Sequence, residues 1–469
     1  MSAAQTIWLR SRSRFLSLTL GSQTRIAYSA VLLLAAILRL VNLQSPHALV
    51  FDEVYYVRDA WTMLNLGYEG KWPDGVDFVA GGGTGFTTEG EFIAHPPLGK
   101  WLIAIGIAIF GPTNPFGWRF ITALSGIAVV LLTMLIARRI FASLSTATLA
   151  GFIVAIDGIA ITMSRTALLD GMLAMFILAA LLALLRHLDS PSTGVWLVVA
   201  GVLLGAATAV KWSGLYAVAA FGIWVVATET WRARRESPGR SLASTAVFPA
   251  VRAVVLVLPF VAITYLASWS GWLFSGGGYD RNSSETGGVI GALESLWNYH
   301  RAMYGYNIGL VTPHSYQANP FGWLLMIRPT AFFYDTGIGD GMTQYITSVA
   351  NPLTWWLGVV ALGFVCWLTV KRNWWTGTVI IAGVAATYIP WLFFSHRTVF
   401  QFYTVSLEPF LALALAFGLT VLYRNGRSSV ARGLVVAAGA VSVFFMPVWM
   451  GLPIPIWFAA MHYWFVSWI

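Results

Sequence analysis

The pair Asp52–Glu53 lies in the stretch SPHALVFDEVYYVRDAW, residues 45–61, directly after a run of apolar residues. Only 10% of the 469 residues are charged, so two adjacent carboxylates at the end of a hydrophobic segment need an explanation. Adjacent carboxylates repel each other, and partial burial raises the cost of ionising them. One interpretation is structural, with the pair capping a helix or pairing with Arg58. The other is chemical, because a carboxylate can serve as a general base.

Four arginines lie near the ends of apolar segments, namely Arg39, Arg119, Arg165 and Arg397. The guanidinium group offers a forked set of donors that matches phosphate oxygens. For each arginine the alternative is that the long side chain extends to the lipid headgroups. If all four lie at one membrane face, we expect them to hold an anionic group, and a lipid phosphate fits.

His95 and Lys100, in AHPPLGKW, add polar groups to the loop that carries the acid pair. We interpret them as supporting residues for substrate binding. The alternative is structural, because a lone histidine is often a core residue and the two prolines stiffen the backbone in any case.

Other kinds of chemistry lack their sequence patterns. The chain contains no His-x-x-x-His pair or acidic repeat at metal-ligand spacing, so we expect no metal. It contains no Gly-x-Ser-x-Gly elbow and no Ser-His-Asp order. The Gly-rich stretch at 81–85 is not followed by Gly-Lys-Ser/Thr, which excludes a phosphate-binding loop of the Walker type.

The composition is that of a polytopic α-helical membrane protein. Hydrophobic residues make up 58% of the chain, and they come in runs of about 20 residues, the length that crosses a bilayer. The net charge of +9 is spread between these runs and forms no continuous patch, so we expect no nucleic-acid partner. The single cysteine, Cys366, can form neither an intrachain disulfide nor a cysteine-based metal cluster.

The apolar runs predict eleven spans. They cover residues 26–43, 119–137, 145–161, 165–185, 194–210, 212–230, 247–269, 351–370, 375–393, 400–423 and 430–449. The arginines before the first run place the N-terminus in the cytoplasm and, for an odd number of spans, the C-terminus outside. The later basic turns then all fall on the cytoplasmic side, which supports the count. These turns contain Arg138, Arg139, Arg186, residues 231–240, Lys371, Arg372 and residues 423–432.

Two long loops, 44–118 and 270–350, fall on the outer side in this topology. The first contains the acid pair, and its stretch 96–111 is apolar enough to be a twelfth span. A twelfth span would place the basic residues at 138 and 139 outside, so we expect an interfacial or half-inserted helix there.

Several segments resemble the protein O-mannosyltransferase family, in the family's order along the chain. They are LRLVNLQSPHALVFDEVYY, HPPLGKWLIAIG, WRFITALSG, SRTALLDGMLAMF and HRTVFQFYTVSLEPF, which together extend over about residues 30–425. The acid pair alone is a weak signal, because many lipid-linked sugar transferases have an acidic motif there. The series taken together is specific.

The resemblance implies a single GT-C transmembrane catalytic domain over 1–469, with eleven helices, in the cell membrane. It also implies transfer of mannose from a polyprenyl-phosphate-mannose donor to Ser or Thr hydroxyls of proteins at the extracytoplasmic face, with inversion and without a metal or other cofactor. Asp52 would be the base, Glu53 would position a substrate, and Arg119, with Arg397 and Arg165, would hold the donor phosphate. The acceptors would be secreted or membrane proteins, including chains emerging from the translocon.

The sequence departs from eukaryotic members in two places. The second outer loop is too short for their large sugar-binding-like domain, which indicates a bacterial, actinobacterial-type member. The segment FQFYTVSLEP differs from their corresponding motif, which leaves the roles of Gln401 and Tyr403 open. Two alternatives remain at this point: a related GT-C transferase that acts on a lipid or glycan, and a secondary transporter, since intramembrane charges also line transport pathways.

Overall fold

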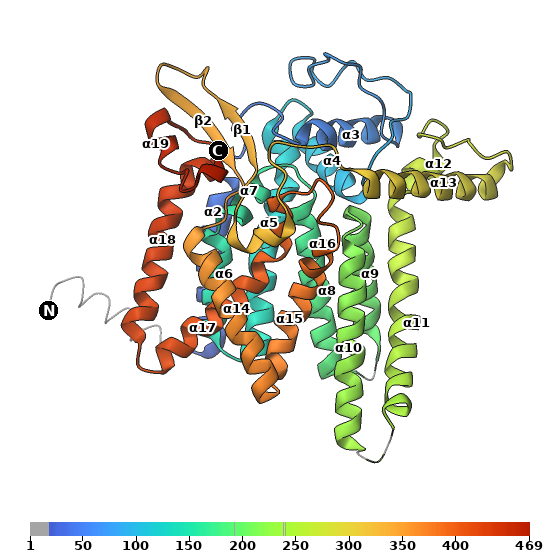
Figure 1. Cartoon of the computed structure of the whole chain (residues 1–469). Helices are drawn as coiled ribbons and strands as arrows, with labels where there is room; N and C mark the ends of the chain where they lie inside the picture. The colour runs from blue at the N-terminus through green and yellow to red at the C-terminus, as the bar shows by residue number, and fades with distance from the viewer. Residues whose placement is uncertain (1–17, 192, 238, 240) are drawn as a thin grey trace.

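The protein, described here by a computed structural model over residues 18–469 except 192, 238 and 240, is mostly helical (Figure 1). The α-helices are α2 (Leu20–Leu40), α3 (Glu53–Leu66), α4 (Leu98–Phe110), α5 (Pro115–Phe141), α6 (Leu144–Ile156), α7 (Gly158–Arg165), α8 (Asp170–Asp189), α9 (Val195–Val210), α10 (Gly214–Glu236), α11 (Leu242–Ser268), α12 (Ser270–Phe274), α13 (Gly288–Gly309), α14 (Pro352–Arg372), α15 (Trp375–Thr387), α16 (Ile389–Leu392), α17 (Glu408–Arg424), α18 (Ser428–Met450) and α19 (Ile456–Ala460). The shorter elements are the 3-10 helices η1 (Pro320–Leu325), η2 (Gln401–Ser406) and η3 (Val466–Trp468) and the strands β1 (Ala331–Asp335), β2 (Met342–Thr347) and β3 (Pro453–Pro455).

Seven helices of the described chain are long and apolar enough to cross a membrane alone, namely α2, α5, α8, α10, α11, α14 and α18. The bent pair α6–α7 would make an eighth span, and α4, α9 and α15 are shorter apolar helices. The protein is therefore a multi-pass membrane protein, as its composition predicts. Each of the eleven expected segments coincides with a helix or with consecutive helices. The count of eleven crossings stays a prediction.

The expected span 145–161 is wrong as a continuous helix, because it bends by 58° between α6 and α7. Asp157 lies at the break. Its Oδ1 accepts hydrogen bonds from the backbone N–H groups of Ile159 and Ala160, at 2.9 and 3.3 Å. A carboxylate that caps a new helix start in this way competes with continuation of the previous helix. The break therefore follows from a side-chain contact and leaves no trace in the hydrophobic pattern.

The segment after the break shifts the next helix. The expected span 165–185 begins later, at Asp170, because α7 runs to Arg165 and residues 166–169 are not helical. This short connection lies beside the loop that carries the acid pair, where Ala167 contacts Glu53. An irregular segment at this depth is tolerated because protein groups satisfy its backbone.

The connections between helices sort into two ends of the bundle (Figure 1). The short helices α3, α4, α12 and α13 and the strands lie at the upper end in this view. The turns that join α5 to α6, α8 to α9, α10 to α11, α14 to α15 and α17 to α18 lie at the lower end. The basic residues that we expected at one membrane face lie in or next to the last helical turns before these connections, so they share one end of the bundle. That this end faces the cytoplasm stays a prediction.

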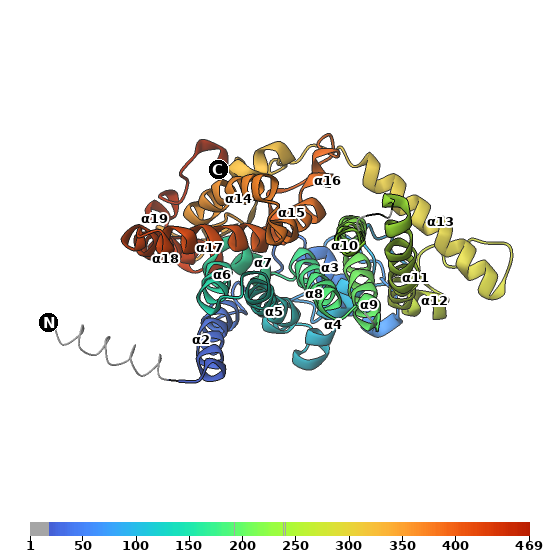
Figure 2. The same cartoon turned by 90° about the horizontal axis from the view of Figure 1, so that it is seen from below.

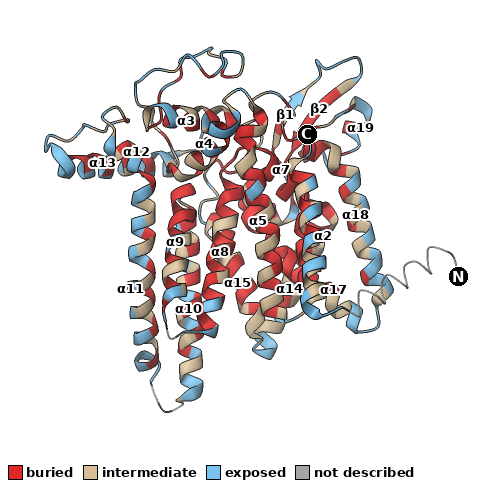
Figure 3. Ribbon diagram, turned by 180° about the vertical axis from the view of Figure 1, so that it is seen from behind, coloured by how far each residue is buried: buried red, intermediate tan, exposed pale blue. Residues whose placement is uncertain are grey.

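The centre of the bundle contains α5 and α8, seen end-on in Figure 2 between α2 and α6 on one side and α9, α10 and α11 on the other. Burial follows this arrangement (Figure 3). In the apolar 18-residue stretch of α8, 78% of the residues are buried, whereas in the corresponding stretch of α11 only 17% are buried. The apolar residues of α11 are thus left for lipid, while those of α8 form the protein core.

Helix α4 has 13 residues, which corresponds to a length of about 20 Å and is too short for a hydrocarbon layer of about 30 Å. It lies with α3 at the upper end of the bundle and packs against the first half of α5 (Figure 1). Helix α15 has the same length, so length alone does not decide the place of α4 in the membrane, and the half-inserted helix expected for 96–111 stays a prediction.

A small antiparallel sheet, in the order β1-β2-β3, joins the second long loop to the C-terminal segment. Tyr334 pairs with Tyr345 between β1 and β2, and Thr343 pairs with Ile454 between β2 and β3. The sheet therefore connects the two parts of the chain on either side of the helices α14 to α18.

The grouping of basic turns predicts which face is cytoplasmic. In a variant with Cys366 replaced by alanine, we expect a cysteine at Thr87, exposed in the first long loop, to react with a membrane-impermeant maleimide added to intact cells. A cysteine at Glu236, exposed at the end of α10, should react only after the membrane is opened. The reverse pattern would overturn the topology.

Candidate active site

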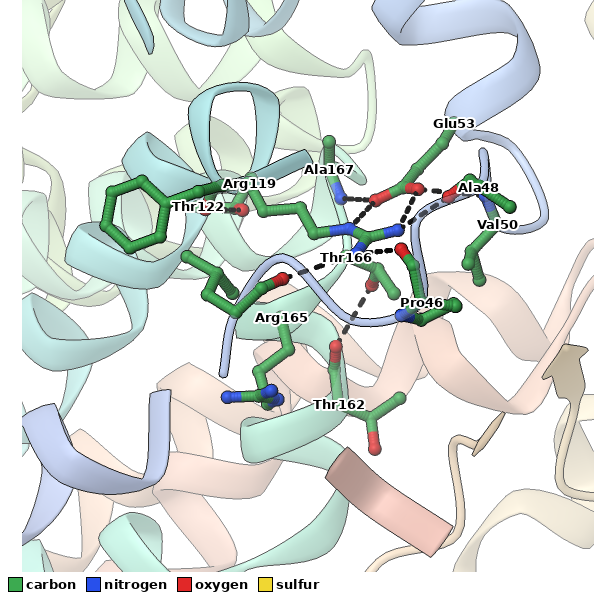
Figure 4. Close-up of polar contacts among 12 residues, drawn as sticks. Pro46, Ala48, Val50, Glu53, Arg119, Thr122, Thr162, Arg165, Thr166 and Ala167 are labelled. Carbon is green, nitrogen blue, oxygen red and sulfur yellow. Dashed lines mark hydrogen bonds and ion pairs between the residues drawn. The ribbon is translucent and has the colours of Figure 1, made fainter. Parts of the chain in front are cut away.

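Glu53 forms a fully buried ion pair with Arg119 (Figure 4). The two carboxylate oxygens accept hydrogen bonds from Nε and Nη2 of Arg119, each at 2.8 Å. They also accept from the backbone N–H groups of Ala167 and Val50, again at 2.8 Å. With four donors on one buried carboxylate, the charge of Glu53 is balanced and its orientation is fixed.

The remaining donors of Arg119 bind the loop before α3. Its Nη1 donates to the carbonyl oxygens of Leu43 and Pro46, at 3.3 and 2.9 Å, and its Nη2 also donates to that of Ala48 at 2.9 Å. All five N–H groups of the guanidinium are thus engaged by protein acceptors. These contacts favour a structural role for Arg119 over the expected phosphate role, because a phosphate would have to displace them.

Two further arginines cap helix ends in the same manner. Arg165 donates from Nη1 and Nη2 to the carbonyl oxygens at the end of α2 and just beyond it, including those of Val41 and Asn42 at 2.8 Å each. Arg39 donates to the carbonyl oxygens of Val154 and Ala155, at the end of α6. The last carbonyls of a helix lack intrahelical partners, so both arginines satisfy groups that would otherwise be buried unpaired. These contacts likewise disfavour the expected phosphate role of Arg165.

Arg397 differs from the other three arginines. It is half-buried, and its one hydrogen bond to a side chain is a long one, 3.4 Å from Nη2 to Oδ1 of Asn307. Its Nε is buried and has no partner among the described residues. The Nε of Arg39 also has no partner among the described residues, but the Arg39 side chain is fully buried. Of the four arginines, half-buried Arg397 therefore has the donors that a substrate could reach most readily.

The carboxylate of Asp52 is less enclosed than that of its neighbour Glu53. It is half-buried, occupies the N-cap position of α3, and makes no side-chain hydrogen bond to the described residues. Phe51 before it adopts a left-handed backbone conformation with φ of 52°, which is unfavourable for a large side chain and is held here by the surrounding contacts. The turn thus directs Glu53 into the protein and leaves Asp52 with a free carboxylate.

The electrostatic surroundings of Asp52 suit a proton acceptor. Burial raises the pKa of the Asp52 carboxyl to about 6, an effect that the positive charge of Lys211 opposes and the negative charge of Asp170 reinforces. A group with a pKa near 6 is mostly ionised at neutral pH, yet it is more basic than an ordinary aspartate.

Asp170 and Lys211 were not expected from the sequence. The Lys211 ammonium donates to both carboxylate oxygens of Asp170, at 2.9 and 3.1 Å, and lies 3.7 Å from the ring centre of Tyr403. Each is a lone charge at the end of an apolar run, the same signal that drew attention to Asp52. Tyr403, whose role was open, therefore contacts the site through its ring.

Lys100 and His95 fall into different environments. Lys100 is fully buried and forms ion pairs with Asp59, at 3.5 Å, and Glu69. Its contacts are those of a structural residue that joins α4 to α3, whereas the expected support of substrate stays a prediction. The pKa of His95 is held well below its ordinary value by burial and by the positive charges of Lys211, Lys100 and Arg397. His95 is thus a neutral imidazole close to the cations of the site.

Two further expectations concern Gln401 and metal binding. The Gln401 amide donates to the carbonyl oxygen of Trp323 at 3.0 Å, a buried structural contact. Among the described residues, no group of three or more His, Cys, Asp or Glu side chains has the arrangement of a metal site. The expectation that the reaction needs no metal stays a prediction.

Comparison with known proteins decides the family. Residues 29–275 match the family model described as dolichyl-phosphate-mannose-protein mannosyltransferase, and residues 292–468 match the C-terminal four-span region of protein O-mannosyltransferase. The chain is 33% identical to the polyprenol-phosphate-mannose–protein mannosyltransferase of Mycobacterium tuberculosis, over 93% of this chain and 90% of that one. The chain belongs to the protein O-mannosyltransferase family. It is a membrane-bound glycosyltransferase, as the resemblance implied.

Other members and solved structures agree with this assignment. The polyprenol-phosphate-mannose–protein mannosyltransferase of Corynebacterium glutamicum is 29% identical over 94% of this chain and 93% of its own. The Saccharomyces cerevisiae Pmt1-Pmt2 complex, solved with its sugar donor, has the same fold, with a TM-score of 0.77 at 14% identity over 97% of this chain and 94% of that one. ArnT from Cupriavidus metallidurans, with a TM-score of 0.52 at 17% identity, shares the GT-C fold over 90% of this chain and 64% of its own. The GT-C fold expected for this family member is therefore confirmed.

The contacts of Arg119 predict a loss of stability when it is replaced. In Arg119→Met, the Glu53 carboxylate stays buried without its ion partner, which should lower the free energy of unfolding by about 3–5 kcal/mol. Residues 43–51 should also exchange backbone hydrogen for deuterium faster. Unfolding in detergent and hydrogen–deuterium exchange by mass spectrometry measure the two effects.

Arg138→Met is the matched control, because Arg138 lies on the same helix and makes no hydrogen bond to the described residues. A stable Arg119→Met protein with normal exchange over 43–51 but weaker donor binding would contradict the structural role and restore the expected phosphate role.

Proposed function

We propose that this enzyme transfers mannose from a polyprenyl-phosphate-mannose donor to Ser and Thr hydroxyls of proteins. The names of the mycobacterial and corynebacterial relatives support the donor and the protein acceptor. The proposed chemistry rests mainly on the different surroundings of the two neighbouring carboxylates, Asp52 and Glu53. The Glu53 carboxylate accepts four hydrogen bonds, while Asp52 is half-buried, unpaired and more basic than an ordinary aspartate.

In the proposed reaction Asp52 takes the proton of the acceptor hydroxyl. The hydroxyl oxygen forms a bond to the anomeric carbon of mannose while the bond from that carbon to the phosphate oxygen breaks. The electron pair leaves with the polyprenyl phosphate. A glycosyl phosphate already has a good leaving group, so the protein has to supply a base and positive charge for the departing phosphate.

The arrangement of carboxylates supports inversion of the anomeric centre. A retaining mechanism needs a second carboxylate that attacks the sugar and forms a covalent intermediate. Glu53 is fully buried and its oxygens accept four hydrogen bonds, and Asp170 is engaged by Lys211. Asp52 alone is free, which fits a single displacement.

Arg397 and Lys211 are our candidates for the donor phosphate. The unpartnered Nε of Arg397 is a buried donor that an anion would satisfy, and Lys211 is the cation next to Asp52. His95 stays uncharged between these cations and adds a neutral hydrogen-bonding group. Arg119 and Arg165 contribute by fixing the backbone around the site.

We further propose that the site faces the extracytoplasmic side of the cell membrane. The site residues belong to the end of the bundle opposite the basic turns, and basic turns favour the cytoplasm (Figure 1). Acceptors on that side are secreted or membrane proteins, including chains that emerge from the translocon. The polar loop 44–97 would meet such chains, while the lipid donor stays in the bilayer.

Replacement of Asp52 by asparagine tests the proposed base. Asp52→Asn keeps the shape of the side chain but loses the basic carboxylate, so turnover should fall about 10²–10⁴-fold. The assay is transfer of radiolabelled mannose from the polyprenyl phosphate to a Ser/Thr-rich peptide by purified protein. Below pH about 6 the wild-type kcat/KM should fall tenfold per pH unit as Asp52 gains a proton, and the variant should lack this dependence.

Stability separates this role from a structural one. The folded pKa of Asp52 lies above its ordinary value, so the ionised group costs stability above pH about 6 and the cost disappears as pH falls toward 4. Asp52→Asn should therefore have a Tm at pH 7.5 equal to or above that of the wild type. Asp74→Asn, an exposed change in the same loop, is the control for turnover. A folded Asp52→Asn enzyme with normal transfer would remove Asp52 from the mechanism, and label in lipid or glycan instead of peptide would refute the acceptor.

Replacement of Arg397 tests the phosphate contact. Arg397→Gln should raise the KM for the donor at least tenfold, because a charged hydrogen-bond donor to the phosphate is lost. Arg397→Lys should recover part of this loss, since it keeps the charge without the fork. Arg301→Gln, an exposed arginine on α13, is the control. An unchanged donor KM with a lower Tm would show that Arg397 is structural as well.

A further inference from the structure

A cavity of about 640 Å³ lies between α6, α17 and α18, at the end of the bundle opposite Asp52 (Figure 1). Its walls are mainly apolar and include Leu149, Leu419 and Val435. A few polar groups line it as well, among them the hydroxyls of Ser145 and Thr420. The lining thus combines a long apolar surface with polar groups, as in sites for amphipathic molecules.

Two arginines line the same cavity. Arg424 comes from the last turn of α17, is exposed, and has no hydrogen-bond or ion-pair partner among the described residues. Arg432 comes from α18, and its Nε and Nη2 donate to the carbonyl and hydroxyl oxygens of Ser428, at 3.2 and 3.4 Å. These bonds hold its guanidinium near the turn between the two helices. Among the described residues that line the cavity, none has a carboxylate to balance the two charges.

The start of α18 adds a third positive feature. The helix begins at Ser428 with Arg427 at the N-cap position, and no side chain caps its first turn. The N–H groups of an uncapped first turn and the helix dipole both favour an anion. Arg424 and Arg432 therefore line an otherwise apolar cavity, and the uncapped start of α18 at Ser428 precedes the first lining residue of that helix, Ala431, by three residues.

We propose that this cavity binds an anionic glycerophospholipid, with the phosphate at Arg424 and Arg432 and an acyl chain along the apolar wall. Basic pockets between transmembrane helices recognise anionic headgroups in this way. A soluble phosphate would leave the apolar wall unfilled, and an uncharged lipid would leave the positive charges of both arginines unbalanced. The site lies apart from Asp52 and does not depend on the proposed reaction.

Native mass spectrometry of the full-length protein in neutral detergent tests the proposal, with phosphatidylglycerol and phosphatidylcholine as competing probes. We expect the wild type to retain phosphatidylglycerol in preference. Arg424→Gln should weaken this binding about fivefold, and Arg424→Gln with Arg432→Gln about 30-fold, since each basic group near a membrane surface contributes about a factor of five. Val436→Trp, which fills the cavity, should lower retention of both lipids.

Lys371→Gln with Arg372→Gln is the matched control, because it removes the same charge at the same end of the bundle, in residues that do not line the cavity. It should bind phosphatidylglycerol like the wild type. Arg424 makes no side-chain contact that folding needs, so Arg424→Gln should keep the wild-type Tm without added lipid. Equal retention of the two lipids by the wild type would overturn the proposal. So would a loss of phosphatidylglycerol binding in the control as large as that in the variant with Arg424→Gln and Arg432→Gln.

Discussion

The buried ion pair between Glu53 and Arg119 holds the active-site end of this protein together. Taking two charges out of water is costly, and the cost is recovered only when every donor and acceptor has a partner. Here the pair joins α3 to α5, and its remaining hydrogen bonds reach the loop 43–50 and Ala167 after α7. A movement of the loop at Leu43, Pro46, Ala48 or Val50 would therefore break a hydrogen bond to the buried pair. Asp52, one residue away, is thereby held at the edge of the site with its own carboxylate free.

The need to give every buried polar group a partner also explains the other buried arginines. The hydrocarbon layer offers no water to carbonyl oxygens, so an irregular segment at that depth needs donors from elsewhere in the protein. Arg39 supplies them to the end of α6, and Arg165 supplies them to the end of α2. The bend at Asp157 and the turn before α3 are tolerated for this reason. In our proposal, the positive charge left for substrate comes from Arg397 and Lys211.

Much of the fold could be predicted from the chain itself. The length of the apolar runs is a strong signal, because the bilayer imposes a minimum length on each span, and all eleven expected segments are helical. The sequence also predicts an interfacial place for the short helix α4, since a further span would put the basic residues after α5 on the outer side. The break at Asp157 could not be predicted, because it depends on backbone groups of α7 and of Asn351, almost 200 residues away in the chain.

For the site, the sequence by itself determined which residues were unusual: an acid pair at the end of a span, and arginines at the outer ends of others. Those features depend on local composition, and the cost of placing a charge in an apolar setting makes them visible. Only the tertiary structure decided what each does. It paired Arg119 with Glu53, brought Asp170 and Lys211 to Asp52, and left Arg397 with a free donor. Hydrogen-bond partners come from residues far apart in the chain, and no local pattern records which of two neighbouring carboxylates is satisfied and which remains free.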